Sequence, residues 1–378
     1  MNLQRTFAIA YKETLQVWRD PRSLAIALLM PFMQMGLLGY GVSLDIKKVP
    51  LCIYDEERSQ ASRELGQRFI ASGWFSRVEQ LSDERALRAA LDRRSCFGAV
   101  TLPVNFSRTL AMTGSAQVQV IFDATDVNTT NISLGYAQGV IAQTTADFRT
   151  AWAAAHGLRP ASTGVVDYEP RVWFNEGLDS RNFIIPGVVA VILGLIGAQL
   201  TSLTLAREWE RGTMEQLIST PVSSLELMLG KLVPYFVIGL IDAAFCLCVA
   251  AFWFDVPFRG ALTTLILTTA LFNLVVLGIG YLISVRVRSQ LGASQIAVTL
   301  TMMPITLLSG YTFPIDQMPA PVQALSLVVH ARYFITILRA VFLKGSSIPD
   351  LAVPVLALVV YAAVIMWLAA RGFRKSLE

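Results

Sequence analysis

The feature that most constrains the fold is a set of long segments without any charged residue. Ser23 to Leu44 and Asn182 to Ala206 are two of them. A helix needs about 20 apolar residues to cross the hydrocarbon core of a bilayer, and both segments are long enough. Inside a membrane every backbone N–H and C=O group must be paired within the protein, which a helix achieves by itself. The chain is therefore predicted to be an α-helical integral membrane protein.

Composition agrees with this class and excludes others. The 378 residues are 54% hydrophobic and 15% charged, whereas soluble proteins carry about 25% charged residues. The net charge of +4 is too small to indicate nucleic-acid binding. No Gly-x-x-x-x-Gly-Lys-Ser/Thr motif occurs, so we do not expect the chain to hydrolyse ATP through a P-loop. Its two histidines, His156 and His330, are too few and too scattered for a metal site, and we expect no cofactor.

Six transmembrane helices are predicted. The first, residues 23–44, is interpreted as a retained span, because its apolar run is too long for a signal peptide and no small-x-small cleavage site closes it. Pro31 is expected to kink this span. The remaining spans fall within residues 181–371, at Asn182–Ala206, Leu225–Phe254, Gly260–Val285, Ser289–Ile315 and Leu351–Ala370.

Three further segments accompany the spans. Residues 1–22 are predicted to form an amphipathic helix at the cytoplasmic membrane surface, because large apolar residues recur there at spacings of three and four. Residues 314–348 are interrupted by Arg332 and Arg339, so they are expected to form an outer re-entrant hairpin buried against other protein. Residues 372–378 are expected to be a cytoplasmic tail.

Residues 45–180, between the first two spans, differ from the rest because charged residues are frequent. Strand patterns alternate with helical ones, which predicts a small α/β domain. Arg171–Asn175 is interpreted as a strand that returns to the membrane. The other predicted strands are Val49–Tyr54, Cys96–Leu102 and Val118–Phe122, and the helices are Arg58–Ser72, Asp83–Arg93, Pro103–Met112 and Asn128–Ala155.

Cys52 and Cys96 fall in two of these predicted strands. A disulfide between them is compatible with a location outside the cytoplasm, and two buried thiols fit the pattern at least as well. Both alternatives stay open.

Lysine and arginine near the span ends predict the orientation, because they gather on the cytoplasmic side of membrane proteins. One side of the membrane collects Arg5, Lys12, Arg19, Arg22, Arg207, Arg211, Lys231, Arg286, Arg288, Arg371, Arg374 and Lys375. The short connections on the other side hold Arg259, Arg332, Arg339 and Lys344. Both termini are therefore predicted to be cytoplasmic, and the α/β domain to lie outside.

A short charged island separates the second and third spans. It begins at Arg207 and ends at Pro221. Thr213, with Gln216 three residues later, predicts a capped helix, and Ser223 with Glu226 predicts a second capping box. We expect residues 207–220 to form an amphipathic helix at the membrane surface, either a solvated connector or a docking element for a soluble partner.

The phrase Arg207-Glu-Trp-Glu-Arg-Gly-Thr-Met-Glu-Gln-Leu217 resembles the cytoplasmic coupling segment of type-2 ABC transporter permeases, in particular the bacterial multidrug-export subgroup with a large periplasmic domain. Supporting phrases run along essentially the whole chain. They are Lys12-Glu13, Arg19-Asp-Pro-Arg22, Phe183-Ile-Ile-Pro-Gly187, Lys231-Leu-Val-Pro-Tyr235, Val256-Pro-Phe-Arg-Gly260 and Ser309-Gly-Tyr-Thr-Phe-Pro-Ile315.

The resemblance implies one permease half of an ATP-driven exporter in the bacterial inner membrane. It implies a separate ATP-binding subunit, a second permease half that is identical or related, and a periplasmic adaptor protein. The residues expected to contact the ATP-binding subunit are Arg207, Glu208, Trp209, Glu210, Arg211, Thr213 and Glu215. The outer hairpin expected to close the pathway includes Phe313, Pro314, Met318 and Pro319. His330 stands where the family usually has proline, so the local bend and the role of this histidine are open.

Three polar residues inside predicted spans are candidates for the translocation path. Asp242 is the only acid well inside a span, and such a group marks either a substrate path or a hydrogen bond between helices. Gln199 and Asn273 are uncharged, and for them a helix-packing role is the main alternative.

The predicted function is export of amphipathic drugs or similar compounds by alternating access. The substrate and the choice between homodimer and heterodimer stay open. A different class is a non-transporting envelope scaffold or receptor whose periplasmic domain binds a ligand. An integral membrane enzyme is disfavoured, because the sequence contains no Ser/His/Asp or metal-ligand cluster.

Overall fold

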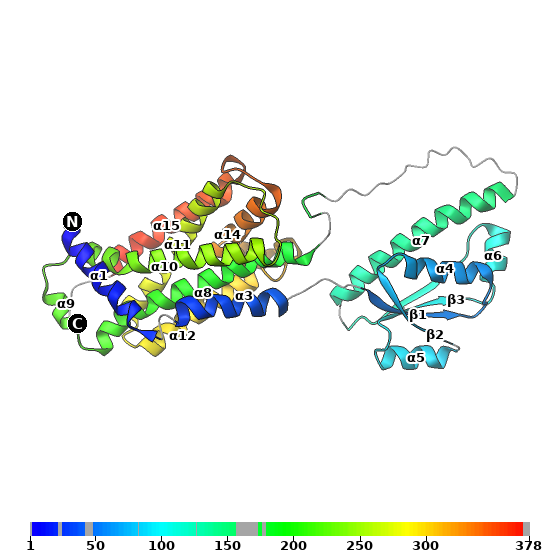
Figure 1. Cartoon of the computed structure of the whole chain (residues 1–378), viewed down its shortest axis with the longest axis horizontal. Helices are drawn as coiled ribbons and strands as arrows, with labels where there is room; N and C mark the ends of the chain where they lie inside the picture. The colour runs from blue at the N-terminus through cyan, green and yellow to red at the C-terminus, as the bar shows by residue number, and fades with distance from the viewer. Residues whose placement is uncertain are drawn as a thin grey trace. The chain divides into compact units, whose positions relative to one another are not determined.

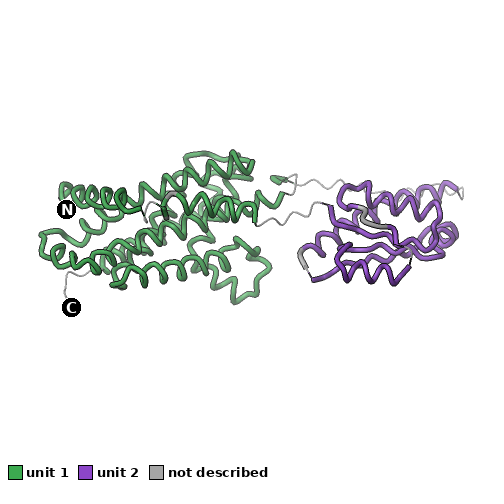
Figure 2. Tube along the Cα trace, turned by 60° about the horizontal axis from the view of Figure 1, so that its bottom comes forward, with its two compact units in different colours: residues 1–43, 171–378 green, residues 44–170 purple. Residues whose placement is uncertain are grey.

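The chain is divided into two compact units (Figure 2). A computed structural model describes residues 2–21, 25–41, 48–81, 83–125, 127–155, 173–175 and 179–372. The first unit, Met1–Ser43 with Arg171–Glu378, is helical and is called the helical unit. The second, Leu44–Pro170, contains a β-sheet and is called the sheet unit.

The helical unit is built around α8, Ser180–Glu210. This helix packs against α3, α10, α11, α12 and α14 (Figure 1), and 89% of its most apolar window is buried. Small residues allow the close approach, since a Cβ at Gly280 would overlap the Thr201 hydroxyl group. The helices around it are α1 Leu3–Trp18, η1 Ala25–Leu29, α3 Met30–Gly41, α9 Met214–Ser219, α10 Ser224–Phe252, α11 Leu262–Arg286, α12 Gln290–Leu308, η2 Ile315–Gln317, α13 Ala320–Ser326, α14 His330–Arg339, η3 Ala340–Lys344, η4 Pro349–Leu351 and α15 Ala352–Gly372.

Among the described residues, five helices are long and apolar enough to cross a membrane. They are α8, α10, α11, α12 and the helix Pro349–Gly372. A sixth candidate is the pair α13 and α14–η3, which is bent by 88° and is either a broken span or a re-entrant loop. The protein is therefore a mostly helical chain with several apolar helices of membrane-spanning length.

The structure differs from the predictions at two of the spans and at one strand. The fifth predicted span, Ser289–Ile315, is too long, because α12 ends at Leu308 and Gly310 adopts a left-handed backbone with φ of 82°. A π-helical turn, η1, precedes Pro31, whose missing N–H group cannot continue an α-helical hydrogen-bond ladder. Trp173–Asn175, the described part of the predicted returning strand, is not a strand.

The sheet unit contains four strands in the order β2–β1–β3–β4. Strand β1 pairs in parallel with β2 and β3, and β4 runs antiparallel to β3. The strands are β1 Val49–Asp55, β2 Phe75–Leu81, β3 Gly98–Leu102 and β4 Gln119–Phe122. Three of them match the predicted strands. Edge strand β2 was not predicted, because charged residues interrupt its apolar positions.

Helices cover both faces of this sheet. Alternate residues of β1 point to opposite faces, so Leu51 and Ile53 enter one core and Cys52 enters the other. Figure 1 shows α5 on one side of the sheet and α4, α6 and α7 on the other. These helices are α4 Gln60–Ala71, α5 Glu84–Asp92, α6 Phe106–Thr113 and α7 Val127–Ala155. Cys52 and Cys96 form a disulfide in the α5-side core, with Cα atoms 5.7 Å apart.

Candidate functional site

The charged island after α8 is divided differently from the prediction. Helix α8 continues through Glu210, so Arg207 and Glu208 belong to its last turn. Gly212 then adopts a left-handed backbone with φ of 68°, and the separate helix α9 begins only at Met214. The predicted helix over 207–220 is therefore two elements joined by a sharp turn.

Thr213 is not a helix cap through its side chain, which corrects the predicted capping box. Its backbone is right-handed helical, and its hydroxyl group donates to the Glu208 carboxylate. A capping residue normally has an extended backbone, which places its oxygen to accept from the N–H groups of the first turn. With a helical backbone, the Thr213 hydroxyl is instead directed to the Glu208 carboxylate, a strong charged acceptor. The second capping box is confirmed: the Ser223 hydroxyl accepts from the Glu226 N–H group, and the Glu226 carboxylate accepts from the Ser223 N–H group.

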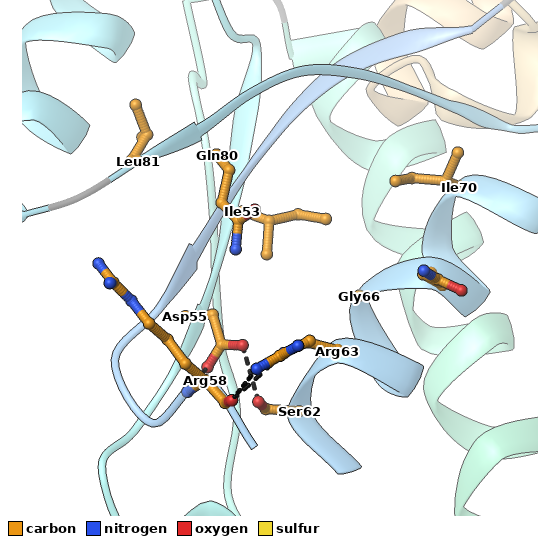
Figure 3. A pocket seen from close by; sticks show the side chains of 10 residues that line it. Ile53, Asp55, Arg58, Ser62, Arg63, Gly66, Ile70, Gln80 and Leu81 are labelled. Carbon is orange, nitrogen blue, oxygen red and sulfur yellow. Dashed lines mark hydrogen bonds between the residues drawn. The ribbon is translucent and has the colours of Figure 1, made fainter. Parts of the chain in front are cut away.

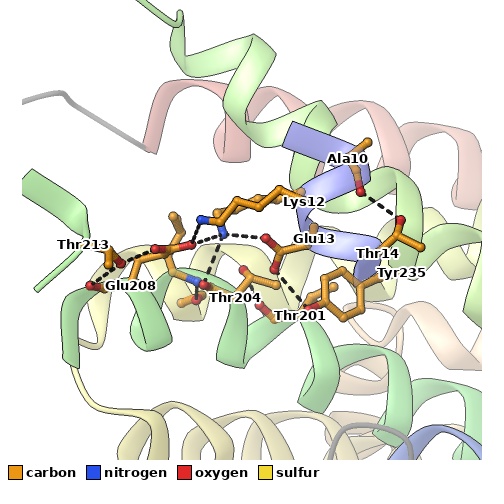
Figure 4. A network of polar contacts seen from close by, with 12 residues as sticks. Ala10, Lys12, Glu13, Thr14, Thr201, Thr204, Glu208, Thr213 and Tyr235 are labelled. Carbon is orange, nitrogen blue, oxygen red and sulfur yellow. Dashed lines mark hydrogen bonds and ion pairs between the residues drawn. The ribbon is translucent and has the colours of Figure 1, made fainter. Parts of the chain in front are cut away.

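Glu208 lies in the interior and is only 3% exposed (Figure 4). Its Oε1 atom accepts hydrogen bonds from Lys12 Nζ at 2.8 Å and from Lys231 Nζ at 3.2 Å. It therefore connects the end of α8 to both α1 and α10. Glu208 is thus enclosed by residues of the helical unit, and its contact with an ATP-binding subunit stays a prediction.

Lys231 is the central cation of this cluster. Its ammonium group donates to Glu13 Oε2 at 2.9 Å, to Glu208 Oε1 and to the Thr204 carbonyl oxygen at 3.4 Å. These three acceptors match the three N–H donors of a lysine. The Tyr235 hydroxyl donates to the other Glu13 oxygen at 3.2 Å. Lys231 and Glu13 are each 1% exposed.

We call Lys12, Glu13, Glu208 and Lys231 the ionic junction. Its two carboxylates and two ammonium groups balance in charge, and they join α1, α8 and α10 beside the turn into α9. Removing one member of a buried ion pair leaves an uncompensated charge, which costs about 3–5 kcal/mol. The junction therefore makes the relative position of these three helices sensitive to the end of α8.

Glu13, Lys231 and Tyr235 were not predicted as site residues. The sequence signal for them was only that they stand in phrases that carry the resemblance. A sharper signal was available: Lys231 is the one cation in a predicted span, and Glu13 lies beside Lys12 in a segment rich in apolar residues. A charge in apolar surroundings requires a partner of opposite sign.

Of the remaining predicted docking residues, those other than Arg207 lie nearer the surface. Glu210 accepts hydrogen bonds from both the backbone and the side-chain amide of Gln290, at the start of α12. The Arg288 guanidinium group lies 4.5 Å from the ring centre of Trp209. Arg211 and Glu215 are exposed. Arg207 is buried, and its Nη2 atom lies 3.1 Å from Asp20 Oδ2.

Helix α9 packs with its apolar side toward the helical unit. Met214 is 1% exposed, and Leu217 and Ile218 contact the same core. The apolar side of the predicted amphipathic helix is therefore turned inward. The polar side, with Glu215 and Gln216, faces outward.

The three candidates for the translocation path occupy different helix contacts. Gln199 donates to the Ser294 hydroxyl at 3.3 Å, which links α8 to α12. Asn273 donates to the Phe236 carbonyl at 3.0 Å, which links α11 to α10. Asp242 of α10 is 3% exposed, and its Oδ2 atom has no hydrogen-bond partner among the residues that the structure describes. Gln199 and Asn273 thus have packing partners, and Asp242 Oδ2 has none.

At the bent hairpin, the candidate gate residues lie around η2. Pro314 and Pro319 stand directly before η2 and α13, while Phe313 is exposed. Arg339 anchors the hairpin: its Nε and Nη2 atoms donate to the carbonyl oxygens of Phe183 at 3.1 Å and Gly310 at 3.0 Å. Met318 is half-buried and accepts, through its carbonyl oxygen, a hydrogen bond from the Gln323 side chain.

His330 is packed inside the helical unit, not exposed. It is 8% exposed, and its ring lies 5.6 Å from that of Phe272, which stacks on Phe334. The open question about this residue is therefore answered in favour of packing.

The sheet unit has a pocket of about 440 Å³ beside α4 (Figure 3). Asp55, at the end of β1, accepts hydrogen bonds from the Arg58 N–H group at 2.8 Å and the Ser62 hydroxyl at 2.7 Å. Arg63 donates to the Arg58 carbonyl oxygen. Ile53 and Ile70 supply apolar lining. The pocket combines apolar walls with polar residues, as small-molecule sites do.

Comparison with known proteins adds an independent finding. A family model described as "ABC-2 family transporter protein" matches residues 22–371. The Escherichia coli (strain K12) protein named "Probable multidrug ABC transporter permease YbhS" is 37% identical over 385 residues, which cover 100% of this chain and 99% of that protein. "Probable multidrug ABC transporter permease YbhR" of the same organism is 30% identical, with 91% of each chain covered. "Inner membrane transport permease YhhJ", also from that strain, is 28% identical, with 87% of this chain and 86% of that protein covered.

Proposed function

The chain belongs to the ABC-2 family of transporter permeases, and from this premise we propose that it is one transmembrane half of an ATP-driven exporter. The exporter moves amphipathic drugs or similar compounds out of the bacterial cytoplasm or inner membrane by alternating access. Membership of this family implies an ATP-binding partner. In our proposal that partner is a separate subunit, which hydrolyses ATP.

The proposed arrangement has six spans, with both termini in the cytoplasm. Residues 23–44 form the first span, five follow at the candidate helices, and residues 314–348 form a re-entrant hairpin. The sheet unit then lies outside, on the periplasmic side. Two observations support this orientation: the uneven distribution of lysine and arginine at the span ends, and the Cys52–Cys96 disulfide, since such bonds persist in oxidising compartments.

The observation that carries the coupling mechanism is the ionic junction beside α9. Glu208 is bonded to Thr213 on one side and to Lys12 and Lys231 on the other. We call residues 207–220 the coupling segment. In the proposal the ATP-binding subunit contacts its exposed polar side, including Glu210, Arg211 and Glu215. A displacement of that segment then reaches α1 and α10 through Glu208. ATP shifts the equilibrium because the subunit binds one conformation better than the other.

The complete exporter in this proposal contains a second permease half and a periplasmic adaptor. Helices α12 and Pro349–Gly372 have only 22% and 17% of their apolar windows buried, so they have apolar surface available for a second half or for lipid. The hairpin with Phe313, Pro314, Met318 and Pro319 closes the outer end of the path. The sheet unit receives the adaptor.

Charge reversal on the exposed side of the coupling segment tests the docking surface. We expect Arg211→Glu with Glu215→Arg to abolish association with the ATP-binding subunit and nucleotide-dependent transport in proteoliposomes. Membrane insertion is expected to be unchanged. The matched control is Glu84→Arg with Arg88→Glu, an exposed pair on α5 of the sheet unit. Normal association and transport in the first double variant would contradict the docking assignment.

A second candidate function rests on the pocket of the sheet unit. Its volume of about 440 Å³ fits a small ligand, as expected for an envelope receptor that does not transport. Gln67→Trp, on the exposed side of α4, is expected to fill this pocket. If that variant lost a ligand response while transport was absent from the wild type, the receptor function would replace the exporter.

A further inference from the structure

A groove on the helical unit runs between α1, η1 and α10. Its volume is about 440 Å³. Tyr11 and Trp18 line it from α1, and Val237 and Ile241 line it from α10. All four side chains are more than half exposed, so the groove opens toward the outside of the helical unit. Its position is distinct from the ionic junction, although the same two helices form both.

Asp242 is the one carboxylic acid among the described residues that line this groove. The side chain is 3% exposed, yet its Oδ2 atom accepts no hydrogen bond from any residue in the described part of the chain. No ion pair found among the described residues involves it. An ionised carboxylate away from water is strongly unfavourable unless a positive charge or several donors accompany it. The groove therefore presents an acceptor without a donor.

The walls of the groove favour a ligand with a large apolar part. Phe7, Tyr11 and Trp18 supply aromatic rings, which attract cations through their faces. On α10 the lining extends from Val233 to Asp242, about 14 Å at a rise of ~1.5 Å per residue. Thr14 supplies no free donor to the groove, because its hydroxyl donates to the Ala10 carbonyl.

We propose that this groove binds a monovalent lipophilic cation, with its charge at the Asp242 carboxylate and its apolar body between α1 and α10. A quaternary ammonium or phosphonium ion suits the groove because it needs no hydrogen-bond partner and its positive charge balances that of one carboxylate. Binding of this cation does not depend on the proposed exporter function. Only the further step, that the bound cation is a transported substrate, rests on it.

A second groove provides an internal comparison. It has a volume of about 600 Å³, lies along the C-terminal part of α10 and includes Asp255, Phe258 and Phe342. Asp255 is exposed, so water screens its charge. This groove has apolar walls and an acid but no buried carboxylate, and we do not expect it to select a cation.

Equilibrium binding tests the proposal with two probes of similar size. The full chain is placed in nanodiscs of phosphatidylcholine, without nucleotide or partner subunits. The probes are tetraphenylphosphonium, which is cationic, and triphenylphosphine oxide, which is neutral. We expect Asp242→Asn to weaken tetraphenylphosphonium binding at least tenfold and to change binding of the neutral probe less than twofold. Val237→Trp, which narrows the groove, is expected to weaken binding of both.

Two control variants are expected to bind both probes as the wild type does. They are Asp255→Asn in the second groove and Leu356→Trp at an exposed position of α15. Wild-type affinity of Asp242→Asn for the cation would overturn the proposal, as would unchanged binding in Val237→Trp. Equal losses of both probes in Asp242→Asn would also overturn it, since the groove would then hold a neutral chain such as a lipid acyl group.

Failure of this proposal is distinguishable from failure of the exporter function. Binding is measured here without ATP, whereas the exporter is tested by association with the ATP-binding subunit. If cation selectivity is lost but the ATP-binding subunit still associates, only the cation site is contradicted. If the cation binds at Asp242 but no ATP-binding subunit associates, only the exporter function is contradicted.

Discussion

At the scale of single residues, Lys231 is a buried cation that contacts two carboxylates. Its ammonium group is enclosed by the carboxylates of Glu13 and Glu208 and by a backbone carbonyl. The stability of such a cluster depends on its completeness, because each buried charge has exchanged water for one specific partner. Lys12 contacts the same Glu208 oxygen, but its side chain is 52% exposed.

We expect Lys231→Met to destabilise the protein by about 3–5 kcal/mol, because two buried carboxylates lose their common cation. The measurement is unfolding of the detergent-solubilised protein in increasing SDS. Lys12→Met is the control, with an expected loss of about 0–1 kcal/mol because water already solvates that ammonium group. Equal stabilities of the two variants would show that the ionic junction contributes little.

At the scale of elements, the turn between α8 and α9 determines how the coupling segment meets the bundle. Gly212 supplies the left-handed backbone at this turn, and a Cβ added there would meet no neighbouring atom. A substitution at Gly212 therefore changes the backbone preference and nothing else.

In the sheet unit, the start of α6 is capped by a residue from another segment, because Asn105 makes no side-chain cap. Glu57, from the loop after β1, accepts from the Ser107 N–H group and hydroxyl instead.

Gly212→Ala is expected to cost about 1–2 kcal/mol, since an L-residue is strained in the left-handed region. In reconstituted exporter it should also reduce nucleotide-dependent transport, because α9 is displaced from its packing site. Gly36→Ala is the matched control: it lies in helix α3 with open space around it, and helical alanine is favoured over glycine by about 0.5–1 kcal/mol. If both variants behaved like the wild type, the turn would not require glycine.

Because the Glu57 carboxyl is bonded to Ser107, we expect the stability of the start of α6 to depend on pH. The hydrogen bond from the Ser107 hydroxyl, with that from the Ser107 amide, lowers the pKa of the Glu57 carboxyl below its ordinary value of 4.5. The lowered pKa means that the contribution to stability is complete above the unfolded-state value and is lost as pH falls through the folded-state value.

We therefore expect the urea midpoint of the sheet unit to fall between pH 7 and pH 3 more in the wild type than in Glu57→Gln. Glu84→Gln, at an exposed position of α5, should keep the wild-type pH dependence. If the urea midpoint changed with pH equally in Glu57→Gln and in the wild type, the hydrogen bonds of Glu57 would not be the source of the pH dependence.

At the scale of the whole molecule, the chain contains two units with separate cores. Among the described residues, the buried apolar side chains of the helical unit form one cluster, and those of the sheet unit form two others on either side of the sheet. The Cys52–Cys96 disulfide connects β1 to the segment before β3 and lies entirely within the sheet unit. Since neither core includes residues of the other unit, the two are expected to unfold independently.

Cys52→Ser with Cys96→Ser is expected to destabilise the sheet unit by about 2–4 kcal/mol, because the unfolded chain regains the freedom that the cross-link removed. Scanning calorimetry of the full chain should show this as a lower midpoint for one transition and an unchanged midpoint for the other. Cys246→Ser with Cys248→Ser, the free cysteines of α10, is the control for loss of thiols. An equal shift of both transitions would contradict the independence of the units.

Most elements of the fold were predictable because their signals are local. Uncharged runs such as Asn182–Ala206 mark helices by length alone, and the Ser223–Glu226 capping box marks the start of α10 within four residues. Three strands of the sheet followed from short apolar runs. Strand β2 was missed because an edge strand needs fewer apolar residues than a central one, so its pattern is weak.

What the sequence by itself determined is therefore the class of protein, its family and the approximate positions of its apolar helices. Only the tertiary structure decided which charges are buried together. Glu13, Glu208 and Lys231 are far apart in the chain, and a charge near the end of a helix is compatible with solvent or with a partner elsewhere in the protein. The same holds for Asp242, whose missing partner is visible only after every neighbouring helix is in place. Burial and pairing are properties of the packed molecule, because the free energy of a charge depends on what surrounds it.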